Sequence, residues 1–391
     1  MKYKYSIAPT SQFYFCSVPF RLDMTPSCPV GCSYCFASAR WNGVNANTQK
    51  PKYADIDILR RKITSQSADI ISKMLDSRMP IHIGGMSDPF ANKKITELTV
   101  SHIRILNAVQ YPMIISTKAP YRMLQNLSVI NVDKTIVQVS MTSMLDKLSK
   151  SLEPGTQAPN DRIWAIRELM RAGVKVSVRI QPIFPELVGH IANELLPELS
   201  KAGVKHIILE FLKLPLERKS REWMYSQNEI YKRTADTYFS ERIRVGREWL
   251  LPTEKRWQMM QPIIEAAKKM DISYGVADYG LYHLSSTDEC CGVSKMMPDT
   301  NWHKGNISYA IKKAHQYVKF GDIEEDILNE GSILRYINSS VRKPHAKTML
   351  DYMRIKWNAP GTANAPDVYN CVEKTSELDN EGNIIYYKKQ C

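Results

Sequence analysis

The stretch Leu169-Met-Arg-Ala-Gly-Val-Lys175 has a near copy further along the chain, Leu199-Ser-Lys-Ala-Gly-Val-Lys205. Each copy ends a segment with apolar residues at helical spacing and precedes a short apolar run of the kind that forms an interior strand. Glycine suits the position after a helix, because it adopts the left-handed conformation without steric cost. The repeated unit of helix, glycine and strand indicates an α/β protein.

Short apolar runs and helical segments alternate on both sides of this repeat. The runs that predict interior strands are Ser11–Phe20, Ile81–Ile83, Met113–Thr117, Thr135–Ser140, Val174–Ile180 and His206–Glu210. The segments with helical spacing are Ile56–Met74, Ile95–Val109, Arg162–Ala172 and Ile191–Ala202, and Asn160-Asp161 is the predicted N-cap of the third. Right-handed crossovers curl such a sheet, so we predict a partial (βα)6 TIM-type barrel.

The character of the chain changes after this series. We predict a barrel core over residues 1–215 and a basic helical segment over 216–278 that completes or flanks the barrel. A mixed, mainly helical C-terminal extension covers residues 279–391. The basic segment ends with one more candidate strand, Ile272–Val276. The expected class is therefore α/β, with a cysteine-containing loop near the N-terminus.

The composition is that of an ordinary globular protein, with 43% hydrophobic and 24% charged residues. These values exclude wholesale disorder, collagen-like repeats and a coiled coil. No apolar run approaches the ~18 residues that span a bilayer, and the first residues lack the apolar stretch of a signal peptide. We therefore expect a cytoplasmic protein that makes no membrane contact.

The chain is strongly basic, with a net charge of +13 from 53 Lys and Arg against 40 Asp and Glu. Such a field attracts phosphate-rich partners and anionic substrates. A second basic stretch covers Arg342–Lys347. Aromatic residues that can stack on bases interleave the basic helices after residue 215, namely Trp223, Tyr225, Tyr231, Tyr238, Trp249 and Trp257. The same helices carry many acidic residues, so a nucleic-acid surface and an ordinary solvated face both fit the pattern.

Three of the eight cysteines, Cys28, Cys32 and Cys35, lie in one short loop, and the others are scattered. A short loop brings their thiolates close enough to hold one iron–sulfur cubane. No fourth cysteine lies nearby, and an iron without a cysteine ligand is open to a cofactor or a substrate. A zinc site completed by a remote cysteine is the alternative.

The spacing Cys-x3-Cys-x2-Cys, with Tyr34 directly before the third cysteine and a βα series after it, resembles the radical S-adenosylmethionine (SAM) superfamily. The resemblance implies that the three cysteines hold a [4Fe-4S] cluster whose open iron binds the amino and carboxylate groups of SAM. It also implies reductive cleavage of SAM to methionine and a 5′-deoxyadenosyl radical, which abstracts hydrogen from the substrate. An electron donor such as flavodoxin or ferredoxin is then an expected partner.

Within the superfamily, residues 12–212 resemble the spore photoproduct lyase-like branch. The resemblance rests on the order and spacing of several motifs. These are Gly84-Gly-Met-Ser-Asp-Pro89, Ser116-Thr-Lys-Ala119, Ser140-Met-Thr142, Leu152-Glu-Pro-Gly155, Arg162, Ala172-Gly-Val174 and Gln181-Pro-Ile-Phe-Pro185.

The same resemblance implies which residues contact the cofactor. Gly84, Gly85 and Ser87 are expected beside the amino group of SAM, where glycine lets the backbone approach closely. Lys118 and Ser140 are expected to contact its carboxylate and its ribose. The remaining expected cofactor residues are Tyr34 and Arg179.

One position departs from the photoproduct lyases proper. They carry a cysteine, in the turn after the second strand, that returns hydrogen to the product radical, and the matching residue here is Gly85. Modification or rearrangement of a base is therefore expected rather than photolesion repair. Cys290 and Cys291 are the candidate catalytic hydrogen donors. Alternatively, they join Cys371 and Cys391 in an auxiliary iron–sulfur cluster, or they are ordinary thiols.

The leading hypothesis is a radical SAM enzyme that abstracts hydrogen from a nucleic-acid or nucleotide base, as in DNA modification. A base in duplex DNA would have to be flipped out of the stack to reach such a site. The rival enzymatic hypothesis is radical modification of a peptide or of a small anionic metabolite. The third hypothesis is a nucleic-acid-binding protein whose metal-stabilised cysteine loop is not catalytic.

Overall fold

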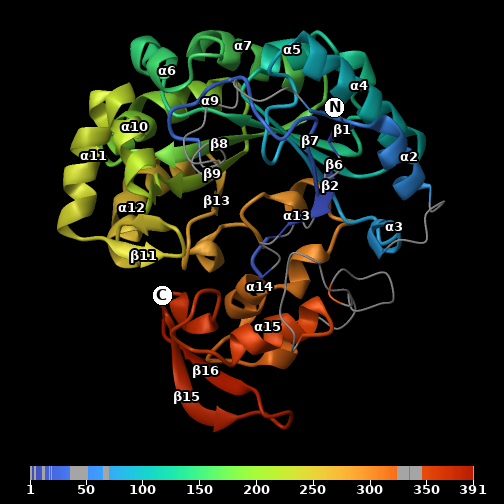
Figure 1. The fold of residues 1–391 in the computed structure, drawn as a ribbon. Helices are drawn as coiled ribbons and strands as arrows, with labels where there is room; N and C mark the ends of the chain where they lie inside the picture. Colours follow the sequence, from blue (N-terminus) through green and yellow to red (C-terminus); the bar gives the residue numbers. More distant parts are fainter. Residues whose placement is uncertain are drawn as a thin grey trace. The chain divides into compact units, whose positions relative to one another are not determined.

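The chain divides into two compact units, which we describe from a computed structural model. The structure describes residues 2–3, 6–10, 14–16, 18, 20–35, 52–64, 70–323, 334 and 346–390. The first unit comprises Met1–Ile7, Leu22–Ile56 and His82–Tyr274, and the second comprises Ala8–Arg21, Asp57–Ile81 and Gly275–Cys391. Most of the predicted basic helical segment, residues 216–274, thus belongs to the same unit as the central barrel strands (Figure 1).

An eight-stranded sheet carries the barrel series, in the order β13-β9-β8-β7-β6-β5-β3-β2. The neighbours β6 and β7, β7 and β8, and β8 and β9 are parallel, as barrel strands must be. The strands cover Ile7–Pro9 (β2), Phe20–Leu22 (β3), Ile81–Ile83 (β5), Met113–Thr117 (β6), Thr135–Ser140 (β7), Lys175–Ile183 (β8), His206–Phe211 (β9) and Ser273–Val276 (β13). This architecture confirms the predicted α/β class.

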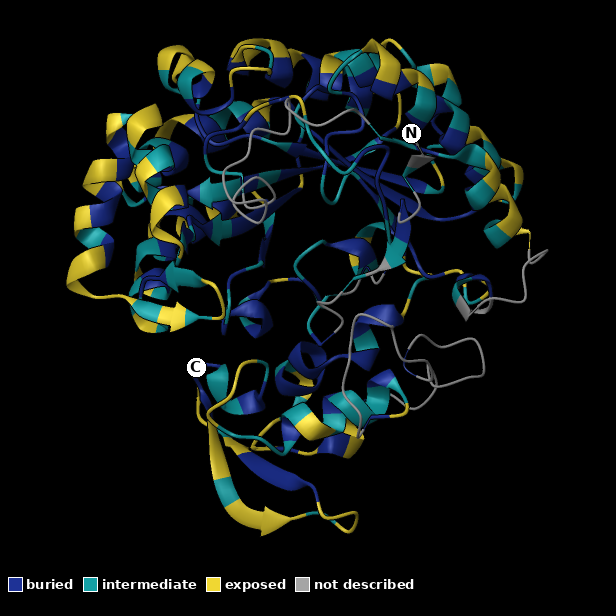
Figure 2. Cartoon of the chain, in the orientation of Figure 1, coloured by how far each residue is buried: buried dark blue, intermediate teal, exposed yellow. Residues whose placement is uncertain are grey.

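Helices of the first unit lie along the outer side of this sheet (Figure 1). Figure 2 shows these helices exposed on their outward faces, whereas the strands behind them are buried, and every residue of β6 is buried. The helices are Lys93–Ala108 (α4), Pro120–Leu124 (α5), Asp146–Leu152 (α6), Pro159–Arg171 (α7), Val188–His190 (α8), Leu196–Lys201 (α9), Arg218–Gln227 (α10), Glu229–Ser240 (α11) and Thr253–Lys269 (α12). A π-helical turn, Ile191–Leu195, joins α8 to α9.

The repeated helix–glycine–strand unit forms as predicted. Gly173 and Gly203 have φ values of +83° and +94°, which glycine adopts without strain. After the first of them, the Val174 N–H donates to the Leu169 carbonyl at 3.1 Å and closes the end of α7. The chain can then turn directly into the next strand.

The predicted N-cap of α7 is wrong. The helix begins at Pro159, with Ala158 as its N-cap residue, and Asp161 lies in its first turn. Proline is favoured at this position because its fixed φ suits the helix and the N–H it lacks would have no partner there.

The described residues of Ser11–Phe20 do not form the predicted strand, except Phe20, at which β3 begins. They are residues 14–16, 18 and 20, and residues 11–13, 17 and 19 lie outside the described part. Phe15 instead stacks on Tyr282, with ring centroids 4.2 Å apart, and the Trp302 indole donates to the Cys16 carbonyl at 3.0 Å. The aromatic residues of this stretch therefore serve packing within the second unit and do not indicate a strand.

Residues 216–274 contain more than the predicted helices. Strands β10 (Leu214–Pro215), β11 (Ile243–Val245) and β12 (Glu248–Leu250) form a small antiparallel sheet. Tyr231 and Tyr238 are fully buried and so are not available to stack on bases. Arg218 pairs with Glu222 at 2.6 Å. These contacts favour an ordinary solvated helical face here.

The second unit is mixed, and its described part ends in a three-stranded sheet of order β14-β16-β15. Trp357 is fully buried and packs edge-on against Phe320 and Tyr386. The elements are Ile56–Ile63 (α2), Ile70–Leu75 (α3), Val293–Met296 (α13), Ile307–Lys313 (α14), Met349–Trp357 (α15), Tyr317–Val318 (β14), Val372–Leu378 (β15) and Ile384–Lys388 (β16). The predicted helix Ile56–Met74 therefore appears as α2 and α3, with residues 65–69 outside the described part.

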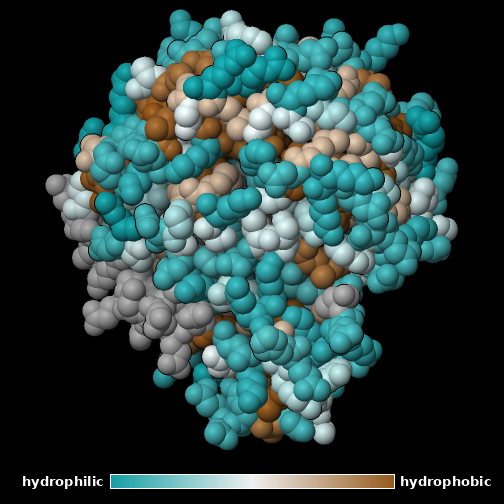
Figure 3. Space-filling view, turned by 180° about the vertical axis from the view of Figure 1, so that it is seen from behind, coloured by the Kyte–Doolittle hydropathy of each residue, from teal (hydrophilic) through white to brown (hydrophobic). Residues whose placement is uncertain are grey.

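The surface seen in Figure 3 is mostly hydrophilic, with smaller hydrophobic groups between the polar ones. Among the described residues, no helix combines the length and hydropathy needed to cross a lipid bilayer. Residues 342–345 of the predicted basic stretch lie outside the described part, as does Cys391.

Candidate active site

The cysteine loop follows β3 in the first unit. Cys32 is buried, Cys28 and Cys35 are half-buried, and none of the three is in a disulfide. Burial, with smaller contributions from the charges of Asp88 and Cys35, raises the pKa of Cys28 to about 12. Burial likewise raises the pKa of Cys32, and the charges of Cys28 and Cys35 add to the effect. The three sulfurs are thus close enough to influence one another, and binding a metal would displace their protons.

Residues distant in sequence hold this loop in place. The Ser33 N–H donates to the Leu152 carbonyl at 2.9 Å, and the Ser33 hydroxyl lies 2.6 Å from the Tyr231 hydroxyl. The Gly155 N–H donates to the Val30 carbonyl at 3.0 Å. A Cβ at position 155 would lie 2.6 Å from that carbonyl oxygen, so only glycine permits this approach.

Asp88 connects the loop to two barrel strands. Its N–H donates to Cys28 Sγ at 3.3 Å. Its carboxylate accepts from the Thr117 hydroxyl at 2.8 Å and from the Lys118 N–H at 2.6 Å, both at the end of β6. Asp88 lies within the motif Gly84–Pro89, but its role was not predicted. Its place in the turn after a parallel strand was the available signal.

The turn after β5 also contains Gly84, Gly85 and Ser87. Gly84 has a φ of +93°, and a Cβ there would lie 2.4 Å from the Ser116 carbonyl oxygen, so the turn needs glycine. Ser87 is buried, and its hydroxyl has no hydrogen-bond partner within the described residues. Buried polar groups are normally satisfied, so this hydroxyl fits contact with a polar ligand.

A buried ionic network lies beside the cysteine loop. Lys118 Nζ donates to the Tyr34 hydroxyl and to Glu153 Oε1, each at 2.9 Å. The Tyr34 hydroxyl donates to the same carboxylate oxygen. Arg162 donates to Glu153 Oε2 at 2.6 Å and to the Ser140 carbonyl at 3.1 Å. Glu153 and Arg162 are fully buried, so each is the other's counter-ion in a dry environment.

The charges of this network are mutually stabilised. Burial by itself raises the pKa of Glu153, but Lys118, Arg162 and the hydrogen bonds overcome it and lower that pKa to about 2. Burial opposes the charged form of Lys118, yet Glu153 raises its pKa. Burial and the charge of Glu153 raise the pKa of Tyr34. At neutral pH the network therefore holds an ionised carboxylate, two cations and a neutral phenol.

A second polar row crosses β5, β6, β7 and β8. His82 Nε2 lies 2.6 Å from the Ser116 hydroxyl, and Arg179 donates to Gln181 Oε1 at 2.9 and 2.6 Å and to Gln138 Oε1 at 3.4 Å. Burial and the Arg179 charge lower the pKa of His82 to about 3, so its ring is neutral. The Gln138 and Gln181 side-chain amide nitrogens are buried and have no partner within the described residues.

The first unit thus contains every residue predicted to bind the cluster or SAM. Lys118 is engaged by Glu153, a partner that the sequence analysis did not assign to it. Arg179 lies in the polar row with Gln138 and Gln181. The contacts of these residues with SAM remain predictions.

The two candidate hydrogen donors belong to the second unit. The sulfurs of Cys290 and Cys291 lie 3.9 Å apart. The contact with Cys291 and burial raise the pKa of Cys290, which keeps it a thiol. Cys371 is in a disulfide, its sulfur lies 3.0 Å from His283 Nε2, and Cys391 lies outside the described part. The predicted auxiliary-cluster role of Cys371 is therefore wrong in this structure, because a disulfide sulfur is not a thiolate ligand. The predicted roles of Cys290 and Cys291 stay predictions.

The residues present fit an iron–sulfur cubane. In the described part of the chain, no three His, Cys, Asp or Glu side chains converge on a point that would suit a single metal ion. A cubane binds each thiolate through a different iron, so its ligands need not converge in this way. Three mutually interacting cysteines on one supported loop, beside the unsatisfied Ser87 hydroxyl, match a cluster with a polar co-ligand.

Sequence comparison finds distant curated relatives, although no protein-family model matches the chain. A radical SAM Nalpha-GlyT isomerase of Pseudomonas phage M6 is 23% identical over 193 residues, covering 47% of this chain and 37% of that protein. The uncharacterized protein ORF301 of Acidianus two-tailed virus is 32% identical over 85 residues, covering 20% of this chain and 28% of that protein. The chain therefore spans well under half the length of either relative.

Solved structures provide the match in fold. Spore photoproduct lyase complexed with a dinucleoside spore photoproduct gives a TM-score of 0.50 at 17% identity, covering 67% of this chain and 78% of that one. A mutant of the same enzyme with the same ligand matches equally, with a TM-score of 0.50 at 17% identity, 67% of this chain and 78% of that one. The chain therefore shares the fold of spore photoproduct lyase, and over about half of its length its sequence is similar to a radical SAM isomerase.

Proposed function

We propose that this chain is a radical SAM enzyme that abstracts hydrogen from a nucleic-acid or nucleotide base. One observation carries the proposal: a loop with three cysteines is joined by Tyr34 to a buried ionic network of Lys118, Glu153 and Arg162. Cys28, Cys32 and Cys35 would hold a [4Fe-4S] cluster. When bound, the cluster and SAM would supply an organic radical strong enough to break an unactivated C–H bond.

The chain's own residues have separable tasks in this scheme. Glu153 keeps Lys118 charged in a buried site, and a fixed cation there favours a carboxylate ligand such as that of SAM. Arg162 donates to the other Glu153 oxygen, so the carboxylate is held ionised between two cations and the network carries one net positive charge. Asp88 holds the turn after β5 against Cys28 and the end of β6.

The polar row supports a substrate rich in hydrogen-bond acceptors. Arg179 is a fixed cation, and the unpartnered Gln138 and Gln181 nitrogens are donors. An acceptor that pairs with them would relieve the cost of burying each group without a partner, about 1–3 kcal/mol. Carbonyl-bearing bases offer such acceptors, and the net charge of +13 would attract their phosphates.

Rearrangement or modification fits this chain better than lesion repair. Gly85 has no side chain to return hydrogen to a product radical. The phage relative is named as an isomerase, which is the class of outcome that we propose here.

The test is anaerobic turnover with separate readouts for cofactor and substrate. Reconstituted protein is incubated with SAM, dithionite and single nucleotides or oligonucleotides, and 5′-deoxyadenosine is measured by chromatography. We expect 5′-deoxyadenosine to form, faster with a base substrate than without one, and Lys118→Met to slow it at least tenfold. Control variant Lys175→Met changes a cation that donates only to a backbone carbonyl, and it should leave the rate unchanged. Zinc in place of iron, or no SAM cleavage, would contradict the proposal.

A further inference from the structure

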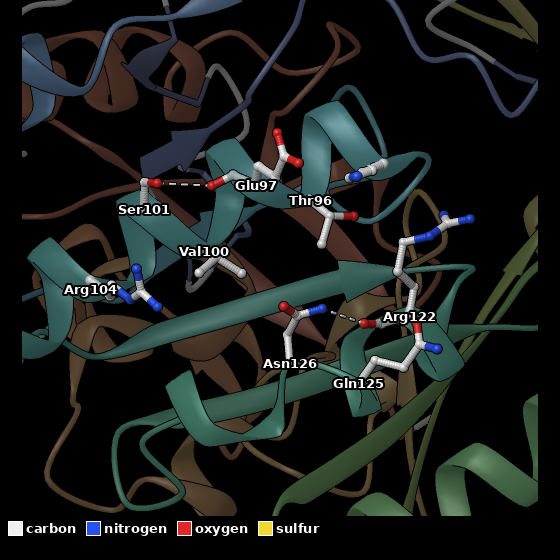
Figure 4. A pocket seen from close by; sticks show the side chains of 9 residues that line it. Thr96, Glu97, Val100, Ser101, Arg104, Arg122, Gln125 and Asn126 are labelled. Carbon is white, nitrogen blue, oxygen red and sulfur yellow. Dashed lines mark hydrogen bonds between the residues drawn. The ribbon is translucent and has the colours of Figure 1, made fainter.

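A groove opens on the outer, helical side of the barrel unit, between α4 and α5. Its volume is about 570 Å³. Figure 4 shows its side chains projecting from the two helices, with Arg104 toward one end and Arg122 toward the other. Buried Val100 contributes to the floor, and Gln125 and Asn126 form part of one wall.

The groove is basic. Its charged side chains are Lys93, Arg104 and Arg122 against Glu97, so its formal net charge is +2 (three cations less one carboxylate). None of the three cations forms an ion pair with an acidic residue in the part of the chain that the structure describes. Cations on other helices of the same unit are paired instead, such as Lys201 with Glu198 at 2.7 Å. Unpaired cations around a hollow attract an anionic partner.

A chain of hydrogen bonds connects this groove to the cysteine loop. Arg122 donates to the Phe90 carbonyl. The Phe90 N–H donates to the Asp88 carboxylate at 2.8 Å, and the Asp88 N–H donates to Cys28 Sγ at 3.3 Å. The Arg122 end of the groove is therefore three hydrogen bonds from a predicted cluster ligand. Gln138, which is proposed to donate a hydrogen bond to the substrate, lies on strand β7 and not in this groove.

We propose that this groove docks an acidic, low-potential electron-donor protein, and the inference rests on the proposed function. An electron has to reach the cluster from outside the chain, and a basic surface beside the segment that supports Cys28 suits an acidic donor. With a flavoprotein donor, one electron leaves the anionic flavin hydroquinone, which becomes the neutral semiquinone without gain or loss of a proton. That electron lowers the charge of the cluster by one, so charge and electrons balance.

The test compares a flavodoxin with dithionite as reductant of the reconstituted holoenzyme. Binding of flavodoxin is measured by calorimetry at low and high salt, and cluster reduction is followed by absorbance. The variant Lys93→Glu/Arg104→Glu should weaken flavodoxin binding and slow reduction by flavodoxin at least tenfold at low salt. Reduction by dithionite, a small ion that needs no docking surface, should stay the same. The matched control Lys201→Glu/Lys232→Glu, on α9 and α11, should behave as the unchanged protein.

The outcomes separate the docking site from the enzyme. Unchanged flavodoxin affinity in the groove variant would overturn the proposal. So would loss of binding to a single-stranded oligonucleotide with flavodoxin binding intact, because that result would assign the groove to nucleic acid. Failure of the proposed function would appear differently, as absence of a cluster or of SAM cleavage with dithionite. The calorimetric comparison tests docking even then, since it needs no turnover.

Discussion

The two places where cysteines gather in this chain differ in what surrounds them. Cys28 receives a hydrogen bond from the backbone of Asp88, and Ser33 in the same loop is bonded to Leu152 and Tyr231 from distant helices. Cys290 and Cys291, in the second unit, are adjacent in sequence, and their sulfurs lie 3.9 Å apart.

The difference teaches that the spacing of the thiols and the anchoring of their loop, and not their number alone, indicate a cluster site. A loop that holds a cofactor must keep its ligands in one geometry, and contacts from several elements provide that rigidity. Cys290 and Cys291 have no residue between them, whereas three and then two residues separate the loop cysteines. The following predictions test this contrast.

Replacing a loop cysteine should have the largest effect. We expect Cys28→Ala, Cys32→Ala and Cys35→Ala each to lose nearly all of the about four irons that a [4Fe-4S] cluster contains. Cys290→Ala/Cys291→Ala should retain them. Iron and sulfide analysis after anaerobic reconstitution measures both, and equal iron loss in the two groups would abolish the contrast.

Breaking the buried ion pair should cost the most stability. Arg162→Met removes the cation at Glu153 Oε2 in the interior while Lys118 stays at Oε1, so urea unfolding should show a loss of up to about 3–5 kcal/mol. Arg171 on the same helix pairs with Glu168 at the surface, and Arg171→Met should cost less than about 1 kcal/mol. Similar losses of unfolding free energy in the two variants would mean that water reaches the network more than its burial indicates.

Acid should weaken the same network. The pKa of Glu153 is about 2 in the folded chain against 4.5 for the ordinary group, so its stabilising effect is complete above pH 4.5 and is lost as pH falls toward 2. The shift corresponds to at most about 3 kcal/mol. Across this window, the unfolding free energy should fall more steeply than in Glu153→Gln, as followed by circular dichroism. Parallel curves would contradict the assignment.

Removing one hydroxyl behind the loop should have the smallest effect. Tyr231→Phe deletes the partner 2.6 Å from the Ser33 hydroxyl and should cost about 1 kcal/mol. Iron should also pass to a chelator faster than in the unchanged protein. Tyr121→Phe, at an exposed position, is the control and should release iron at the original rate.

The barrel strands were predictable because their signals are local. The apolar runs at β6 and β7 are buried almost throughout. The glycines after two helices mark the positions where each helix ends and the chain turns into the next strand. The strand predicted at Ser11–Phe20 failed because aromatic residues serve packing as readily as strand pairing.

The site was predictable only in part. The cysteine spacing is a local signal, but the Glu153 partnership with Lys118 joins residues 35 positions apart. Tyr231 reaches Ser33 across 198 positions. No pattern of short-range spacing encodes such contacts, because folding alone brings these residues together.

Electron paramagnetic resonance of the reduced, reconstituted protein tests the central claim most directly. The account predicts a signal from a reduced [4Fe-4S] cluster that changes when SAM is added and is absent in the Cys28→Ala/Cys32→Ala/Cys35→Ala variant. A signal indifferent to SAM, or one that survives loss of all three cysteines, would contradict it.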